Sequence, residues 1–145
     1  MEACTEVREL YKNTDVYTGK RIRIGGWVRS NRDSKSFGFL VVHDGTFFEP
    51  VQVVYDDKLP NFADIARIGA GAAVLVEGDL TATPQAKQPF EIQASSVTVE
   101  CSTLPSYPLQ KKRHSAEYLR TIPYMRPRTN VSQAVFRVRS LLAFA

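Results

Sequence analysis

The stretch that decides the fold is Arg21-Ile-Arg-Ile-Gly-Gly-Trp-Val-Arg29, in which apolar and cationic side chains alternate. A strand turns successive side chains to opposite faces, so this alternation predicts a strand that is buried on one face. The buried face would hold Ile22, Ile24 and Val28. The opposite face would hold Arg21, Arg23, Trp27 and Arg29. Gly25-Gly26 packs little side-chain volume and predicts a bulge or a sharp bend, which curls a strand around a barrel corner.

Four further β-rich runs follow this strand, separated by turn residues. They cover Phe37–His43, about Pro50–Tyr55, Ala73–Leu80 and Phe90–Val99. Apolar residues at helical spacing predict a short helix over Pro60–Ile68, which Gly69 ends. Five strands with a helix between the third and fourth predict a mainly β protein, a five-stranded Greek-key barrel of the OB-fold type. An SH3-like barrel is the alternative, but its short connections leave no place for the helix.

The two ends of the chain differ from the barrel. At the N-terminus, Thr5–Tyr11 predicts a short helix with Thr5 as its N-cap. After Cys101 we expect a proline-punctuated linker, a brief helix over His114–Thr121, an extended basic stretch over Met125–Arg128 and an apolar helix over Ser132–Ala145. We therefore expect three regions: an OB-fold domain at 1–103, a hinge at 104–131 and the truncated start of a further domain at 132–145.

Composition bounds the function. The chain has 145 residues, 43% of them hydrophobic and 23% charged, which is typical of one globular domain with a short appendage. The sequence shows neither a secretory signal nor an apolar run of membrane-spanning length, so we expect a cytoplasmic protein that does not enter a membrane. Cys4 and Cys101 are expected to be ordinary thiols, and His43 and His114 surface or hydrogen-bonded histidines. No metal site and no catalytic residue is expected, because the residue spacings that such sites need are missing.

The charge is concentrated in two places. Residues 101–145 carry eight Lys/Arg against Glu117 alone, whereas residues 1–100 carry eleven against fourteen acids. Six basic residues and one acid, Asp33, also lie between Lys20 and Lys35. Such segments suggest a polyanionic partner, although a basic tail of this kind, taken on its own, is slightly more often simply solvated.

A basic and aromatic strand face favours single-stranded RNA, which binds through phosphates at Arg/Lys and bases stacked on rings. This face holds Arg21, Arg23, Trp27 and Arg29. The alternative is a solvated edge strand with Trp27 packed under a loop. Phe37 and Phe39 share one face of the second strand, and such a pair is more often core. Gln52, Glu91 and Gln93 match the hydrogen-bonding edges of bases, although outward polarity of a strand explains each of them as well.

Several motifs resemble asparaginyl-tRNA synthetases and extend from about residue 20 to the end of the chain. They are Arg23-Ile-Gly-Gly-Trp-Val-Arg29, Asp44-Gly-Thr-Phe-Phe48, Val51-Gln-Val-Val54, Gln88-Pro-Phe-Glu-Ile92, Tyr107-Pro-Leu-Gln-Lys-Lys-Arg-His-Ser115, Glu117-Tyr-Leu-Arg120 and Arg126-Pro-Arg-Thr129. The first and third are shared with the aspartyl and lysyl enzymes, whereas the Tyr107–Ser115 and Arg126–Thr129 motifs are more specific to the asparaginyl enzymes. Ile122-Pro-Tyr-Met125 departs from the family, and Pro123 is expected to break a helix there.

The resemblance implies an N-terminal domain that binds the anticodon loop of tRNA. By position, Phe39 would stack on an anticodon base, Gln52 would read the middle base, Glu91 would read a second base, and Arg29 and Arg32 would contact bases or phosphates. Further RNA contacts are expected at Arg23, Trp27, Lys35 and Gln93. The resemblance moves Phe39, but not Phe37, out of the core.

The same resemblance implies a longer enzyme. ATP and magnesium would bind C-terminal to this segment, which itself would be inactive and hold no cofactor, and the full-length enzyme would be a homodimer. Three alternatives stay open: the same domain of an aspartyl-tRNA synthetase, a free-standing module for single-stranded nucleic acid, and an OB-fold that binds protein.

Overall fold

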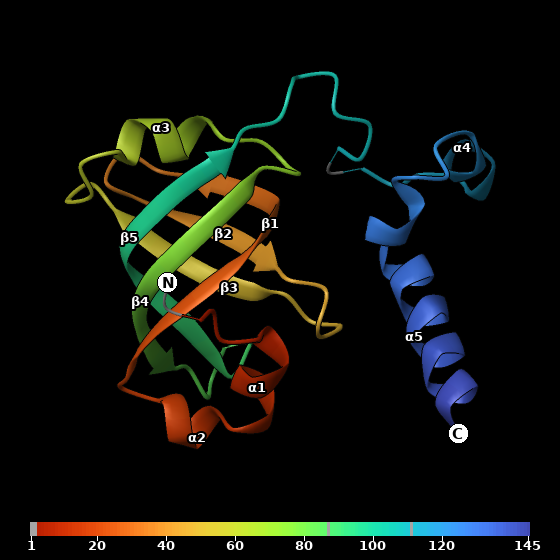
Figure 1. Ribbon diagram of the computed structural model, residues 1–145. Helices are drawn as coiled ribbons and strands as arrows, with labels where there is room; N and C mark the ends of the chain where they lie inside the picture. Colours follow the sequence, from red (N-terminus) through yellow and green to blue (C-terminus); the bar gives the residue numbers. More distant parts are fainter. Residues whose placement is uncertain (1–2, 87, 111) are drawn as a thin grey trace. The chain divides into compact units, whose positions relative to one another are not determined.

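The computed structural model describes residues 3–86, 88–110 and 112–145 (Figure 1). The described chain divides into two compact units, one ending at Pro108 and the other beginning at Leu109. The first unit contains the barrel, the N-terminal helices and the short helix between the third and fourth strands, and the second contains the helices that follow Leu109. Each unit is described by itself below.

The first unit is built on a closed β-barrel. Its strands, as the described residues define them, are β1 (Arg21–Asp33), β2 (Phe37–His43), β3 (Val51–Asp56), β4 (Ala73–Ala82) and β5 (Phe90–Cys101). They pair in the order β1-β2-β3-β5-β4, and β4 returns to β1. Only the β3–β5 pair is parallel among these described strands. With α3 (Phe62–Arg67) between β3 and β4, this topology confirms the predicted mainly β OB-fold.

The core follows the predicted alternation. Ile22, Ile24 and Val28 of β1 are all buried, as expected. In β2 and β3, buried and half-buried residues likewise alternate, which directs one set of side chains into the barrel. The other set faces outward, so the strand period fixes which side chains can meet a ligand.

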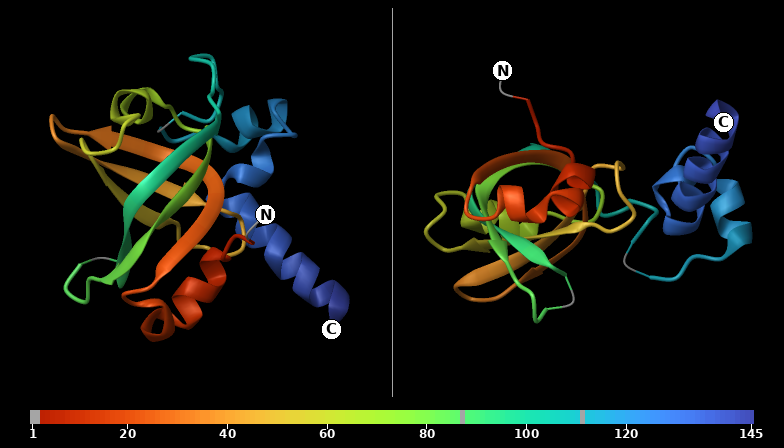
Figure 2. Two further views of the ribbon diagram at one scale, coloured as in Figure 1. Left: turned by 60° about the vertical axis from the view of Figure 1, so that its left-hand side comes forward. Right: turned by 90° about the horizontal axis from the view of Figure 1, so that it is seen from below.

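Strand β1 differs from the prediction in two ways. It continues through Asp33, beyond the Arg21–Arg29 stretch from which it was predicted, and its register shifts between Val28 and Ser30 rather than at Gly25-Gly26. The two glycines pair regularly with β4. A Cβ atom on Gly26 would lie 2.6 Å from the carbonyl oxygen of His43, so this glycine allows two strands to approach closely. The long strand curves around the barrel (Figure 2).

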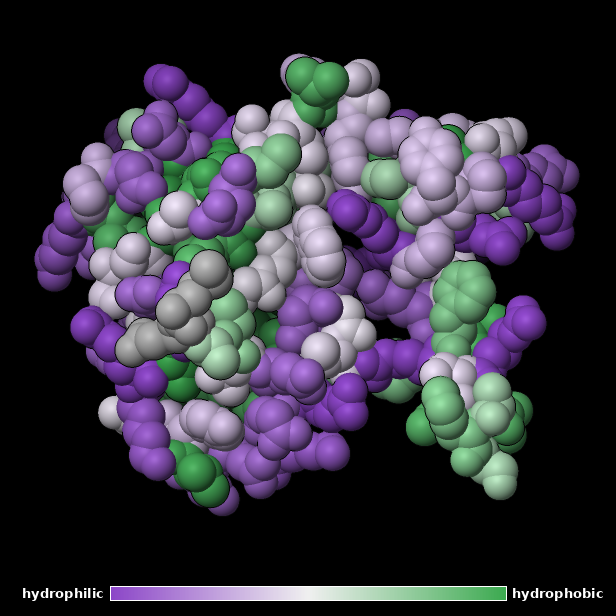
Figure 3. Space-filling view, in the orientation of Figure 1, coloured by the Kyte–Doolittle hydropathy of each residue, from purple (hydrophilic) through white to green (hydrophobic). Residues whose placement is uncertain are grey.

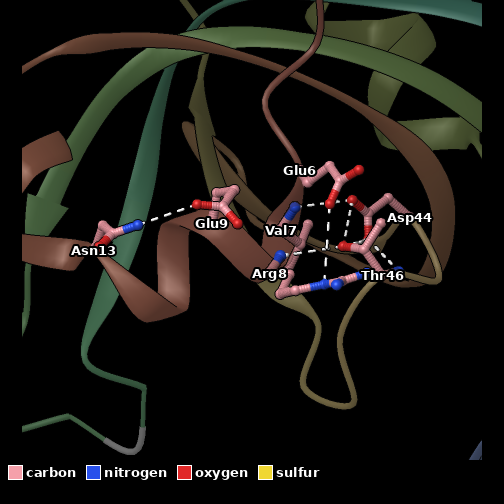
Figure 4. A network of polar contacts seen from close by, with 7 residues as sticks. All are labelled: Glu6, Val7, Arg8, Glu9, Asn13, Asp44 and Thr46. Carbon is pink, nitrogen blue, oxygen red and sulfur yellow. Dashed lines mark hydrogen bonds and ion pairs between the residues drawn. The ribbon is translucent and has the colours of Figure 1, made fainter. Parts of the chain in front are cut away.

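The N-terminal helices are α1 (Val7–Lys12) and α2 (Thr14–Tyr17). Thr5 is not the N-cap as predicted, because α1 begins after Glu6. A distant turn satisfies the first amides of α1 instead: Val7 N donates to Asp44 Oδ2 (2.8 Å) and Arg8 N donates to Thr46 Oγ1 (3.1 Å) (Figure 4). A tertiary contact therefore replaces the local cap that the sequence indicated.

The second unit contains α4 (Ala116–Thr121), a 3-10 turn (Arg126–Arg128) and α5 (Asn130–Phe144). The expected extended stretch over Met125–Arg128 is wrong, because Pro127 lies in the first turn of a 3-10 helix, where its fixed φ is tolerated. The helix before Pro123 ends at Thr121, as expected.

Helix α5 exposes apolar side chains, which gather over its C-terminal part (Figure 3). In the part of the chain that the structure describes, no helix is both long and apolar enough to cross a membrane.

Candidate nucleic-acid interface

An open depression of about 330 Å³ lies on the outer face of the barrel. Arg32, Phe39 and Gln52 line it together with Asp33 and Ser34. The first two lie directly opposite each other across β1 and β2, and Gln52 lies on β3, opposite Val41 of β2. A cation, an aromatic ring and an amide, all expected from the sequence to contact RNA, thus meet at one place.

The register shift in β1 explains why Arg32 faces outward. The buried residues before it, Ile24 and Val28, have even numbers, so an unbroken strand would turn Arg32 inward as well. The shift leaves Arg29 as an extra residue and inverts the alternation, so that Asn31 pairs with the buried Leu40 and Arg32 pairs with Phe39. The bulge therefore directs the Arg32 side chain to the outer face of the strand.

Asn31 is an inward residue that sequence reasoning missed. Its Oδ1 accepts a hydrogen bond from the hydroxyl of Tyr55 (2.9 Å), and its Nδ2 donates to the carbonyl oxygen of Ile65 (2.7 Å). Burial raises the pKa of Tyr55, a nearby Asp33 carboxylate adds to this rise, and the hydrogen bond with Asn31 opposes it. Asn31 thus ties the register shift of β1 to the helix α3 that follows β3.

Glu91 of β5 links two of the predicted RNA contacts. Its Oε2 accepts a hydrogen bond from Nε2 of Gln52 (3.2 Å), and its Oε1 accepts one from Nε2 of Gln93 (3.0 Å). The parallel pairing of β3 with β5 places these residues side by side, although Gln52 and Glu91 lie 39 positions apart in the chain. The depression therefore continues into a hydrogen-bonded row of Gln, Glu and Gln.

Gln88, in the loop before β5, supports this row and was also missed. Its Oε1 accepts a hydrogen bond from the backbone amide of Gln52 (3.1 Å), and its Nε2 donates to the carbonyl oxygen of Pro50 (3.1 Å). A side chain that ties a loop to the start of β3 restricts the backbone that presents Gln52. Its place in the Gln88-Pro-Phe-Glu-Ile92 motif was the available signal.

Phe37 was expected in the core, and this expectation is wrong. It is 43% exposed, and its ring packs edge-on against Phe39, with centroids 5.5 Å apart and planes at 87°. Both residues have odd numbers, whereas the buried residues opposite them on β2 (Gly38, Leu40 and Val42) have even numbers, and His43 at the end of the strand is buried as well. The face that carries Phe39 therefore carries Phe37 as well.

The remaining candidates lie outside the lining of the depression. Arg23 pairs with Glu77 of β4 (Nε–Oε1 3.4 Å), and Trp27 lies near the buried His43, with ring centroids 6.1 Å apart. Arg29 is half-buried, which lowers its pKa, while the phenol of Tyr107 acts in the opposite direction. Lys35 is exposed in the turn between β1 and β2.

Neither histidine belongs to the depression. His114 shares a hydrogen bond with the carbonyl oxygen of Gln110 (3.1 Å) and stacks on Tyr118. Lys111, part of the basic cluster before His114, lies outside the described residues. Among the residues that are described, no group of three or more His, Cys, Asp or Glu side chains could hold a metal ion.

Comparison with known proteins identifies the fold family. Residues 22–100 match the family model described as "OB-fold nucleic acid binding domain". The chain belongs to this family. The match covers all five strands of the barrel apart from Arg21, the first residue of β1, and Cys101, the last residue of β5.

Individual relatives confirm the resemblance to asparaginyl-tRNA synthetases. The chain is 56% identical over 142 residues to an asparagine–tRNA ligase of Acetivibrio thermocellus. The aligned part covers 97% of this chain and 31% of the relative. It is 53% identical over 141 residues to that of Bacillus cereus, covering 97% of this chain and 30% of the relative. The chain thus spans about a third of the length of these curated relatives.

A solved structure shows the same fold. The crystal structure of asparaginyl-tRNA synthetase from Pyrococcus horikoshii complexed with asparaginyl-adenylate matches with a TM-score of 0.85 and 23% identity. The match covers 99% of this OB-fold chain and 33% of the other.

Proposed function

We propose that this OB-fold domain binds the anticodon loop of the tRNA for asparagine, as the N-terminal part of an asparagine–tRNA ligase. The observation that carries the proposal is the depression lined by Arg32, Phe39 and Gln52. It combines a ring for stacking, an amide for a base edge and a cation for a phosphate, the three contacts by which proteins hold unstacked RNA. The similarity to asparagine–tRNA ligases supports the identity of the RNA.

Each residue of the site then has a role. The ring of Phe39 stacks on an anticodon base, Gln52 reads the edge of the middle base, and Arg32 meets a base or an adjacent phosphate. Glu91 contributes to the reading of a second base. The exposed Lys35 contacts the backbone of the loop, and Arg23, Trp27 and Arg29 extend the contact surface along β1.

The longer protein carries the chemistry in this proposal. Residues 1–103 form the anticodon-binding domain, 104–131 the hinge and 132–145 the start of the catalytic domain. ATP and magnesium act in the part of the enzyme beyond these residues. The full-length enzyme is a cytoplasmic homodimer.

A titration with labelled anticodon stem-loops tests the proposal. The chain is titrated with loops bearing GUU, GUC or a scrambled sequence, at two salt concentrations. We expect both GU-containing loops to bind more tightly than the scrambled loop, and the affinity to fall with salt because bound phosphates release counterions. A preference for GUU over GUC supports asparagine specificity in this domain, and the reverse preference supports an aspartyl enzyme. Equal binding of all three loops contradicts anticodon reading.

A further inference from the structure

The Glu91 carboxylate fixes the orientation of the Gln52 amide. A glutamine amide has a donor end and an acceptor end, and a half-turn about its last bond exchanges them. An ionised carboxylate only accepts hydrogen bonds, so the end of Gln52 that faces Glu91 must be its NH2 group. The 3.2 Å contact from Nε2 of Gln52 to Oε2 of Glu91 has this polarity. The amide therefore faces the depression with its acceptor and donor in one defined order.

A defined order matters because uracil and cytosine differ mainly in polarity along one edge. Uracil offers a ring N–H donor beside a carbonyl acceptor, whereas cytosine offers a ring nitrogen acceptor beside an amino donor. A freely rotating amide can complement either base equally well. An amide held in one orientation complements only one of them once the base is fixed by stacking, and it leaves the other with mismatched groups.

Gln93 holds the second oxygen of the same carboxylate. Its Nε2 donates to Oε1 of Glu91 (3.0 Å), two positions along the same outer face of β5. Gln93 is exposed, and its strand partner Val54 of β3 lies two residues beyond Gln52. With Oε1 engaged, rotation of the carboxylate is restricted and Oε2 remains directed toward Gln52. Gln93 thus constrains, through Glu91, the orientation of the Gln52 amide that lines the depression.

We propose that Gln93 is a positioning residue for base discrimination, which acts through Glu91 to keep the Gln52 amide in one orientation. This inference rests on the proposed function and deepens it. It differs from the expectation that Gln93 contacts RNA directly, because the Gln93 amide donates to Glu91 and does not line the depression.

The experiment measures the preference for U over C separately from the overall affinity for RNA. The chain and its Gln93→Ala variant are titrated with anticodon stem-loops that differ only in a U or C at the middle position, and with a scrambled loop. We expect Gln93→Ala to reduce the ratio of the two dissociation constants on the order of threefold, the size of one lost, solvent-exposed hydrogen bond. Binding of the scrambled loop stays unchanged, because no phosphate contact is removed.

Three further variants complete the test. Gln93→Lys retains an N–H donor within reach of Glu91 and should restore the ratio, whereas Glu91→Ala should lower it further by freeing Gln52 entirely. Thr98→Ala, on an exposed position of β5, serves as the matched control and should leave the ratio unchanged. Thermal unfolding midpoints establish that each variant is folded.

The outcomes separate the two proposals. If the unaltered chain prefers the U-containing loop and Gln93→Ala retains the full ratio, the positioning role is wrong, whether or not the overall affinity falls. An equal loss of affinity for U and C loops would identify Gln93 as a direct, nonselective contact. If the unaltered chain binds all loops equally, the proposed function itself fails and this inference fails with it.

Discussion

Two aromatic clusters of the same barrel have opposite environments. Tyr11 stacks on Phe47 with centroids 4.6 Å apart and packs against the buried Phe90 at 4.9 Å. Phe37 and Phe39, at a similar distance of 5.5 Å, lie on an outer face, where Phe37 is exposed and Phe39 is half-buried. The residue types are alike, so the difference comes from strand parity and from the covering helix α1. An aromatic pair therefore indicates a binding surface only when nothing in the fold covers it.

Replacing Phe90 by Ala tests the covered cluster and should have the largest effect. The ring is 1% exposed, so its removal leaves a cavity in the core beneath Tyr11. We expect a loss of about 3–5 kcal/mol in the free energy of unfolding. Chemical denaturation monitored by circular dichroism measures this loss. A variant as stable as the parent chain would show that the cluster is not part of the core.

Replacing Phe39 by Ala tests the exposed cluster. Because the ring lies on the outer face, we expect a small change in stability but a loss of about 1–3 kcal/mol in RNA binding, the value of one base stacked on an aromatic side chain. Fluorescence anisotropy with the GUU stem-loop measures the affinity.

Phe37→Ala is the matched control for Phe39→Ala on the same strand face, since Phe37 lies outside the lining of the depression. Unfolding of Phe39→Ala would instead assign that ring to the core. Equal losses of RNA affinity in the two variants would extend the stacking surface to both rings.

The sequence was sufficient for the fold because alternation is a local property. Ile22, Ile24 and Val28 fall on one face, and the boundaries of β2 agree with the prediction. The exposure of Phe37 was missed because alternation separates two faces without saying whether another layer covers the outer one.

The site was less predictable because its geometry depends on pairing. Periodicity alone turns Arg32 inward, and the bulge that turns it outward is set where β1 passes from β4 to β2. The hydrogen bonds of Glu91 depend on the parallel pairing of β3 with β5, which joins residues 39 positions apart. Residue types in a motif suggested these contacts, but only barrel closure shows which atoms meet.

The turn containing Asp44 caps α1, the helix that carries Tyr11 of the covered cluster. Removing this cap should have a smaller effect on stability. Asp44→Ala removes the acceptor for Val7 N, and we expect a loss of about 1 kcal/mol in the free energy of unfolding, typical for an N-cap. Asp44→Asn retains an oxygen acceptor and should lose less. Glu100→Ala, an exposed acid at the end of β5, is the control. Urea titration distinguishes the variants, and equal stability of Asp44→Ala and Glu100→Ala would show that the turn does not stabilise the helix.

The same cluster should also make stability depend on pH in the alkaline range. Burial, and secondarily the Glu49 carboxylate, raise the pKa of Tyr11 from 10.0 to about 12, and its hydroxyl donates to the carbonyl oxygen of Pro50 (2.8 Å). The folded state thus retains this proton at pH values where the unfolded chain loses it, so the contribution is complete below pH 10 and declines between pH 10 and about 12.

Urea midpoints at pH 8, 10 and 11 measure this decline in the parent chain and in Tyr11→Phe. The variant has no phenol to titrate at this position, so its midpoint should fall less, and the remaining decline would reflect groups such as Tyr55, whose pKa is also raised. Parallel declines in both proteins would contradict a coupling between Tyr11 ionisation and folding. Phe39 has no ionisable group, so its ring should contribute no alkaline pH dependence to RNA binding. This difference in pH dependence distinguishes the exposed cluster from the covered one.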